Sequence, residues 1–286
     1  MAVTLHDGRL PGSTVAQVRA IAQAAADHDL VAPLGEQTLL DLADPTAPAR
    51  HLTVGEPPVG YAALDLRGRP TVELVVAPPA RGRGHGRLLL DAAWDAARDY
   101  DTPQLWAHGN LPAARALAAS AGLSVRRELW QMTADLRPRS PAALPDDVVV
   151  RPFVLGQDED AWLEVNARAF AEHPEQGRLT REDLRARQRE PWFRPDDVLL
   201  AERAGRLVGF AWLKVTGDVG ELYVLGVDPG AQGGGLGRRL TTLALEHLTR
   251  RGAHTGILYT EAANGAAVNL YTAAGFRCSR VDVQYG

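Results

Sequence analysis

The chain has 286 residues, of which 45% are hydrophobic and 23% are charged, and its formal net charge is −4. A chain of this length can bury one large core or two ordinary ones without disulfides or metals. The mild acidity argues against a nucleic acid or an anionic membrane surface as partner, because both select basic surfaces. The single cysteine, Cys278, excludes an internal disulfide framework and a multi-cysteine zinc site, so we expect a reducing compartment.

The sequence carries no visible targeting signal. Its first residues lack a basic segment followed by an apolar run, and no stretch of about 20 apolar residues could span a bilayer. We therefore expect a cytoplasmic protein without a signal peptide. Nearly all basic residues are arginine, and Lys214 is the only lysine. This bias fits a GC-rich genome, and it makes Lys214 a residue to follow.

The predicted elements fall into two similar series. In the first, the predicted helices are 15–27, 36–42, 87–98 and 112–121, and the predicted strands are 51–54, 59–66, 71–76, 104–107 and 124–134. In the second, the predicted strands are 148–154, 198–202, 206–216, 220–227, 255–260 and 277–285, and the predicted helices are 159–171, 180–189, 238–251 and 265–274. Consecutive strands followed by helix, strand, helix and strand predict an α+β fold with a mixed sheet and flanking helices.

An internal repeat underlies this similarity. Residues 76–86 match residues 227–237 at an offset of 151, and residues 113–123 match residues 266–276 at an offset of 153. Both glycine-rich segments follow a β-rich run and precede an amphipathic helical pattern. The chain is therefore interpreted as two copies of one fold.

The repeat also predicts the domain boundaries. We expect an N-terminal domain at 1–135 and a C-terminal domain at 148–286. Residues 136–147 contain three prolines and no periodicity, which is typical of a linker.

The glycine-rich turn after the strand at 220–227 predicts an anion site. Backbone N–H groups at a strand–turn–helix junction attract phosphate, and glycine leaves them accessible. The turn lacks the Gly-Lys-Ser/Thr of a nucleoside-triphosphate loop, and it lacks the placement of a dinucleotide fingerprint.

Two motifs carry a family resemblance. The spacing Val227-x-Pro229-x-x-Gln232-x-x-Gly235-x-Gly237 resembles the acyl-CoA pyrophosphate loop of the GNAT superfamily of N-acetyltransferases. The run from Asn264 to Phe276 resembles the family's N-x-x-A-x-x-L-Y-x-x-x-G-F helix, whose tyrosine reaches the coenzyme sulfur. The resemblance implies acetyl-CoA as cosubstrate, no metal, and tandem GNAT domains.

The resemblance also implies the residues that bind acyl-CoA. In the second copy they are Leu225, Gly226, Val227, Gln232, Gly233, Gly234, Gly235, Leu236, Gly237, Arg238, Asn264, Gly265, Ala266, Ala267, Val268 and Asn269. In the first copy they are Leu74, Val75, Val76, Arg81, Gly82, Arg83, Gly84, His85 and Gly86. A backbone N–H near Gly226 is the expected hydrogen-bond donor to the thioester oxygen.

Catalysis is assigned to the second copy. Glu221, at the start of the strand, is the candidate base, and Tyr271 is the candidate acid for the thiolate. The alternatives are a solvent-facing edge glutamate and a core tyrosine. At these positions the first copy has Pro70 and Ala118, and Glu73 is expected on the other strand face. We therefore expect the first copy to bind acyl-CoA without catalysing transfer.

Four further stretches, at 34–37, 173–177, 220–229 and 258–261, resemble one actinobacterial branch of the superfamily. This resemblance extends over nearly the full chain. It implies a small thiol pseudodisaccharide with a free cysteinyl amine as acceptor. Such a substrate needs acceptors for the amine and mixed partners for the sugar, and the candidates are Glu36, Glu175 and Glu221 as carboxylates, Lys214 as a donor, and Tyr259 as a flat face with a hydroxyl. Each of these residues has an alternative structural role, as a cap, a surface residue or a packed strand residue. We expect a monomer. Acetylation of a protein N-terminus or an aminoglycoside, and a non-catalytic acyl-CoA sensor, remain open.

Overall fold

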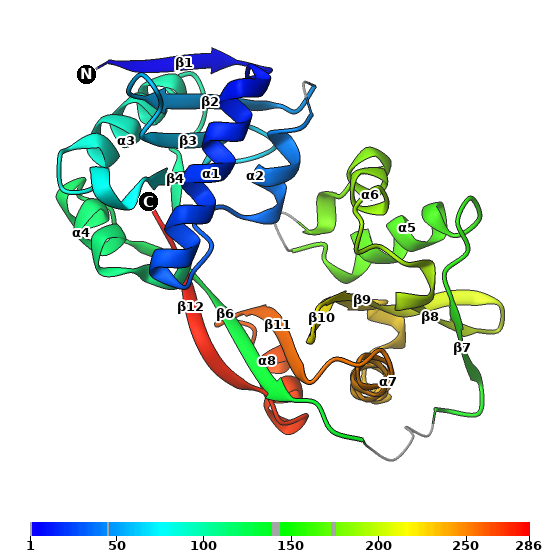
Figure 1. The fold of residues 1–286 in the computed structure, drawn as a ribbon. Coiled ribbons are helices and arrows are strands. Elements are labelled where there is room, and N and C mark those ends of the chain that lie inside the picture. Colours follow the sequence, from blue (N-terminus) through cyan, green and yellow to red (C-terminus); the bar gives the residue numbers. More distant parts are fainter. Residues whose placement is uncertain (1, 45, 139–143, 173–175) are drawn as a thin grey trace. The chain divides into compact units, whose positions relative to one another are not determined.

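The computed structural model describes residues 2–44, 46–138, 144–172 and 176–286 (Figure 1). The chain forms two compact units, here called unit 1 (Met1–Leu129 with Val281–Gly286) and unit 2 (Trp130–Arg280). Strands β6 (Val125–Asp135) and β12 (Arg277–Tyr285) are each divided between the two units.

These units differ from the domains expected from the repeat. The end of the second repeat belongs to unit 1, and the end of the strand that closes the first repeat belongs to unit 2. The limits of the two compact units therefore differ from the expected domain boundaries at residues 135 and 148. Of the expected linker 136–147, residues 139–143 lie outside the described residues.

Unit 1 is a sheet with helices on both faces. Its elements are β1 (Val3–Asp7), α1 (Gly12–Asp29), α2 (Glu36–Asp41), β2 (Ala49–Val54), β3 (Gly60–Asp65), β4 (Thr71–Val76), α3 (His85–Ala96), β5 (Gln104–Ala107) and α4 (Pro112–Ser120), with parts of β6 and β12. Strands β1 to β4 pair antiparallel in sequence order, β5 pairs parallel with β4, and β12 pairs antiparallel with β5.

Two apolar clusters fill unit 1, one on each face of the sheet. Leu89 and Leu90 of α3 pack with Val72 and Val76 of β4 in one cluster. On the opposite face, α1 packs against Val75 of β4 in the other cluster. Alternate residues of β4 therefore face alternate helical layers, as a regular strand requires. Strand β1 was not predicted, and α1 begins at Gly12, three residues before the predicted start.

Unit 2 repeats this arrangement. Its elements are β7 (Val148–Pro152), α5 (Glu159–Ala169), α6 (Arg181–Gln188), β8 (Val198–Arg203), β9 (Arg206–Thr216), β10 (Val219–Val227), α7 (Leu236–Arg250), β11 (Thr255–Glu261) and α8 (Gly265–Ala273), with parts of β6 and β12. Strands β7 to β10 pair antiparallel in sequence order, and β11 pairs parallel with β10. The predicted α+β fold with a mixed sheet is confirmed.

Helices cover both faces of the unit 2 sheet. Figure 1 shows α5 and α6 on one side of β8 to β10 and α7 on the other. Trp162 of α5 and Leu184 of α6 pack with Phe210 and Trp212 of β9. Helices α7 and α8 pack on the opposite face, around Leu222 of β10. No helix among the described residues combines the length and the apolar character needed to cross a membrane.

Candidate active site

Strand β10 carries a β-bulge at Tyr223. Leu222 pairs with Leu213 of β9 and Val224 pairs with Trp212, so Tyr223 is the extra residue. The bulge changes which residues face which helices. Leu222 packs with the α7 layer, whereas Val224 packs with Trp162 of α5, although the two residues are two positions apart. A regular strand would place both on one face.

Glu221 precedes the bulge and lies on the α5–α6 face of the sheet by regular strand alternation. Its neighbours Gly220 and Leu222 face α7, since a Cβ on Gly220 would meet Leu248 Cδ2 at 2.8 Å. Glu221 is paired across the strands with Lys214 of β9. The Lys214 ammonium group lies 4.6 Å from the ring centroid of Trp192. Glu221 and Lys214 therefore share a polar position above an aromatic cluster.

Tyr259 of β11 lies on this same face, because it is two residues beyond Ile257, the β11 partner of Glu221. Its side chain is 38% exposed. Its hydroxyl accepts hydrogen bonds from Gln131 Nε2 at 2.8 Å and Arg280 Nη2 at 3.1 Å. Five residues were predicted to bind the acetyl acceptor. Three of them thus share one face of unit 2: Lys214, Glu221 and Tyr259.

Of the other two residues predicted to bind the acetyl acceptor, one belongs to unit 1 and one lies outside the described residues. Glu36 is the first residue of α2, in unit 1. Glu175 lies outside the described residues.

The glycine turn leads into the N-terminus of α7 as predicted. Gly233 and Gly235 have φ of 87° and 74°, a conformation that favours glycine. A Cβ added at Gly233, Gly234 or Gly235 would meet no heavy atom within 4 Å, so the turn is open on its outer side. The N–H groups of the first helical turn precede the first α-type bond, from Arg239 N–H to Gly235 O. They can bind an anion such as a pyrophosphate.

Unit 1 has the same turn. Gly82 and Gly84 have φ of 73° and 82°, and a Cβ on either would meet nothing within 4 Å. In both turns, the residue that precedes the first of these glycines donates a side-chain hydrogen bond to a carbonyl oxygen of the preceding strand. Arg81 Nε donates to Val76 O at 3.0 Å, and Gln232 Nε2 donates to Val227 O at 3.1 Å.

Arg81 is further engaged by Asp29. Its two terminal nitrogens donate to the Asp29 carboxylate at 2.8 and 2.7 Å, and these hydrogen bonds lower the pKa of Asp29. The side chains of Arg81 and Gln232 therefore stabilise their own turns. Backbone N–H groups remain the natural phosphate ligands of both turns.

Tyr271 of α8 is buried beside the strand that carries Glu221. It is 8% exposed, packs edge-on against Phe276, and belongs to the cluster of Leu222. Burial raises the pKa of its phenol to about 12, so it stays protonated at neutral pH. The Asn264 side chain caps α8 by accepting a hydrogen bond from Ala267 N–H at 3.0 Å.

One expectation about unit 1 is wrong. Glu73 was expected on the strand face opposite to that of Glu221, but β4 has no bulge. The hairpin registers pair Asp65 with Thr71 in unit 1 and Lys214 with Glu221 in unit 2. Thr71, rather than Pro70, is therefore the counterpart of Glu221. Glu73 lies two residues further along and faces the corresponding helical layer.

Glu73 belongs to a buried charged triad that sequence reasoning missed. His108 Nε2 lies 3.0 Å from Glu73 Oε1, and His108 Nδ1 lies 3.1 Å from Asp282 Oδ2. Burial alone would lower the pKa of His108, but the two carboxylates outweigh it and raise this pKa to about 10. Glu73 also accepts a hydrogen bond from Gly35 N–H at 2.7 Å. A carboxylate inside an apolar strand was the only sequence signal.

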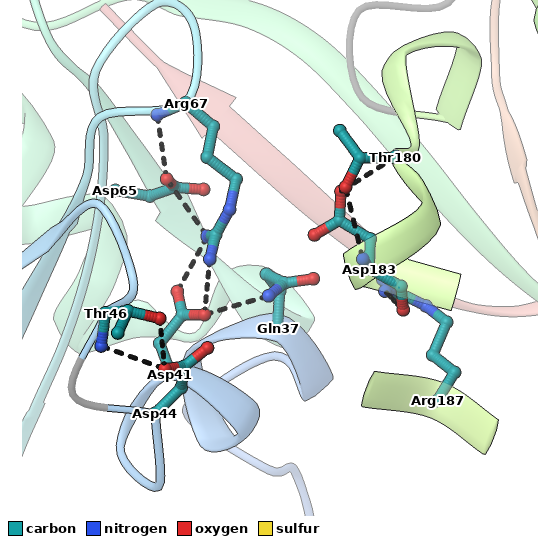
Figure 2. A network of polar contacts seen from close by, with 9 residues as sticks. All are labelled: Gln37, Asp41, Asp44, Thr46, Asp65, Arg67, Thr180, Asp183 and Arg187. Atoms are coloured by element: carbon teal, nitrogen blue, oxygen red, sulfur yellow. Dashed lines mark hydrogen bonds and ion pairs between the residues drawn. The ribbon is translucent and has the colours of Figure 1, made fainter. Parts of the chain in front are cut away.

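Helix α2 is anchored at its other end as well. Figure 2 shows Arg67 donating to both oxygens of Asp41, at 2.8 and 2.6 Å, and Gln37 donating to the same carboxylate at 2.8 Å.

In unit 2, Thr180 and Asp183 form a capping box at the start of α6 (Figure 2). The buried Arg187 of α6 donates to the Tyr223 hydroxyl at 2.9 Å.

A cavity of about 440 Å³ lies at the opposite end of α7 from the glycine turn, lined by Arg194, Asp196, His247, Arg250 and Arg251. His247 and Arg251 are paired there with the fully buried Asp197, at 2.7 and 2.8 Å. Cations near a helix C-terminus stabilise the helix, so this cavity has a structural explanation.

Comparison with known proteins identifies the fold family. The family model described as acetyltransferase (GNAT) family matches residues 23–122 and 161–276. The chain belongs to the GNAT family. It is thus an acetyl-CoA-dependent acyltransferase with two tandem GNAT domains. The two matched ranges correspond to the two copies found in the sequence.

This GNAT protein has curated relatives that match over nearly its whole length. A mycothiol acetyltransferase of Cellulomonas flavigena is 51% identical, over 99% of this chain and 88% of the relative. A mycothiol acetyltransferase of Thermobispora bispora is 49% identical, over 100% of this chain and 99% of the relative.

Solved GNAT structures share the fold at lower identity. A GCN5-related N-acetyltransferase from Sphaerobacter thermophilus has a TM-score of 0.73 and 24% identity, over 99% of this chain and 94% of that chain. A tandem GNAT protein from the clavulanic acid biosynthesis pathway has a TM-score of 0.74 and 20% identity, over 99% of this chain and 97% of that chain. Both likenesses concern the fold.

Proposed function

We propose that this protein transfers the acetyl group of acetyl-CoA to the cysteinyl amine of Cys-GlcN-Ins, producing mycothiol and CoA. The observation that carries the proposal is the near-full-length identity of about one half to relatives named mycothiol acetyltransferase. We further propose that the protein acts in the cytoplasm as a monomer.

The proposed chemistry assigns one proton transfer to each of two side chains. The acceptor ammonium must lose a proton before it attacks, and Glu221 is the proposed base, directly or through a water. A backbone N–H at Leu225–Val227 would stabilise the developing oxyanion of the thioester carbonyl. Tyr271 would protonate the departing thiolate, since its phenol, whose pKa burial raises to about 12, carries its proton at neutral pH.

Polar side chains on the α5–α6 face support the proposed acceptor. A pseudodisaccharide presents many hydroxyl groups and one ammonium group, which need donors, acceptors and a carboxylate. Lys214 is a donor, the Tyr259 hydroxyl can donate or accept, and Glu221 is an acceptor beside them. Glu36 and Glu175 are proposed as further carboxylates for the same substrate.

Unit 1 is proposed to bind acetyl-CoA without transferring the acetyl group. The matching φ angles of Gly82 and Gly84 support binding. Two replacements argue against catalysis in unit 1. Thr71 occupies the position equivalent to Glu221, and the fully buried Ala118 occupies the position equivalent to Tyr271. Glu73 is a poor substitute base because a protonated histidine already engages it.

The test is the release of free CoA from acetyl-CoA by the purified protein. Cys-GlcN-Ins, a peptide panel and an aminoglycoside panel are offered as separate acceptors. Fast turnover restricted to Cys-GlcN-Ins is the expected result. Turnover restricted to peptides or aminoglycosides contradicts the substrate but keeps the chemistry. Binding of acetyl-CoA without turnover on any acceptor contradicts the enzyme and supports a sensor.

A further inference from the structure

The Lys214 side chain lies over two aromatic rings. Its ammonium nitrogen is 4.6 Å from the ring centroid of Trp192 and 5.6 Å from that of Tyr223. The two rings are themselves in contact, with centroids 5.2 Å apart and planes inclined by 57°. These distances are typical of cation–π attraction, which is strongest for tryptophan. The rings therefore restrict where the ammonium group of a long, flexible side chain can lie.

The two rings are themselves held in place. Trp212 of β9, only 1% exposed, contacts both of them, with centroids 6.0 Å from Trp192 and 5.4 Å from Tyr223. Arg187 Nε donates to the Tyr223 hydroxyl at 2.9 Å, and Arg187 Nη1 donates to Asp183 O at 3.0 Å. Side chains locked by packing and hydrogen bonds make a precise support for a binding group.

The bulge in β10 connects this cluster to the candidate base. Tyr223 is the bulged residue, two positions after Glu221. The cross-strand partner of Glu221 is Lys214 itself. A cation that is fixed over the rings is thereby fixed beside the carboxylate expected to receive the acceptor's proton.

The described residues of unit 1 lack this arrangement. By the hairpin registers, Asp65 stands in place of Lys214 and Ala63 in place of Trp212. Strand β4 also has no bulge and hence no counterpart of Tyr223. In the part of the chain that the structure describes, the lysine and its aromatic support therefore occur only in the copy that keeps both Glu221 and Tyr271.

We propose that Trp192 and Tyr223 are positioning residues for the acetyl acceptor: they hold the Lys214 ammonium group above the α5–α6 face, where it donates hydrogen bonds to hydroxyl oxygens of the acceptor. Arg187 fixes the Tyr223 ring. The proposal rests on the proposed function, because it takes Lys214 as a ligand of a polyhydroxylated amine. It adds Trp192, Tyr223 and Arg187 to the determinants of acceptor affinity.

The experiment is a double-mutant cycle on steady-state kinetics. Trp192→Leu, Lys214→Met and the double variant are assayed for CoA release with acetyl-CoA and Cys-GlcN-Ins. We expect Trp192→Leu to raise the acceptor KM about fivefold, the loss typical of a partly desolvated cation–π contact, while the acetyl-CoA KM changes less than about twofold. The double variant should be no worse than Lys214→Met, since Trp192 acts through Lys214.

Two conservative variants separate positioning from general packing. Trp192→Phe keeps a weaker aromatic face and should restore part of the acceptor affinity. Tyr223→Phe keeps the ring but loses the hydrogen bond from Arg187, and should raise the acceptor KM about twofold. Trp94→Phe, in α3 of unit 1, is the matched control and should leave both KM values unchanged.

Specific results would overturn the proposal. Equal rises in the KM of both substrates, or effects of Trp192→Leu that add fully to those of Lys214→Met, would make Trp192 merely structural. If Trp192→Leu fails to fold, Trp192→Phe and Tyr223→Phe take its place in the double-mutant cycle with Lys214→Met, and their effects on the acceptor KM decide the role of the two rings. If the wild type acetylates a different amine, the proposed substrate fails, and the cycle on that amine still decides the role of Trp192. Absence of turnover on every acceptor overturns both proposals.

Discussion

Lys214 and Glu221 face each other across β9 and β10, paired in register two residues before the bulged Tyr223. The same position of the unit 1 hairpin holds Asp65 and Thr71. One fold thus carries a cation and a carboxylate in unit 2 and a carboxylate and a hydroxyl in unit 1. This difference distinguishes the unit expected to catalyse the reaction from the other unit. The glycine turns do not, because they are alike in the two units.

Replacing Glu221 by Gln tests the base. The amide keeps the size of the side chain but cannot accept a proton from the acceptor ammonium, so kcat should fall by about 10²- to 10⁴-fold. CoA release at saturating acceptor is the measurement. Thr71→Val, at the equivalent position of unit 1, should leave kcat unchanged. Normal turnover by Glu221→Gln would remove Glu221 from the mechanism.

Replacing Tyr271 by Phe tests the acid. The ring packs on Phe276 and should keep its place, while the loss of the proton donor should lower kcat by about 100-fold. Because burial raises the pKa of Tyr271 to about 12, the wild type should show no loss of activity from this group up to pH 10. Tyr285→Phe, which removes a buried hydroxyl in unit 1, is the matched control. Unchanged kcat in Tyr271→Phe would favour a purely structural tyrosine.

Much of the fold could be predicted because it depends on local patterns. The strands at 71–76, 104–107, 206–216 and 277–285 have the predicted limits, since each is an alternating or apolar run with polar or turn residues beside it. The two glycine turns were predicted from spacing alone, and their positive φ angles at Gly82, Gly84, Gly233 and Gly235 explain why glycine is needed.

The remaining features depend on contacts that spacing does not encode. A bulge is one extra residue whose position follows from pairing with β9, so the face of Glu73 relative to Glu221 was misjudged. Asp282 meets His108 only because the end of β12 pairs with β5 in unit 1. The cluster of Trp192, Tyr223 and Lys214 likewise combines three separate stretches of chain.

The buried triad predicts a pH-dependent stability of unit 1. The pKa of His108 is about 10 in the folded protein, above its ordinary value of 6.5, so the stabilisation is complete below pH 6.5. It decreases as the pH rises above 6.5 and is lost as the pH passes through about 10. The groups that face this ring are Glu73 from β4, Asp282 from β12 and the stacked Trp106 of β5.

The variant His108→Gln tests the contribution of the charged His108 to the stability of unit 1. The variant leaves two buried carboxylates without their cation and should lose about 3 kcal/mol of unfolding free energy at pH 7. Its unfolding free energy, measured in urea between pH 6 and pH 10, should fall less steeply with pH than that of the wild type. His247→Gln, whose ring pairs with Asp197 in unit 2, controls for the loss of any buried imidazole. Parallel pH curves for His108→Gln and the wild type would show that His108 is not charged.

The two glycine turns give a matched pair of variants. Gly235 and Gly84 both have positive φ, so alanine at either strains the backbone by about 1–2 kcal/mol without a steric clash. Gly235→Ala should raise the KM for acetyl-CoA about tenfold and leave the acceptor KM unchanged, since it distorts the N–H groups at the start of α7. Gly84→Ala should leave turnover unchanged but weaken acetyl-CoA binding to unit 1 about tenfold, measured by calorimetry, where the wild type should bind two equivalents. A wild-type stoichiometry of one would refute binding in unit 1, and equal kinetic losses in both variants would refute the assignment of catalysis to unit 2 alone.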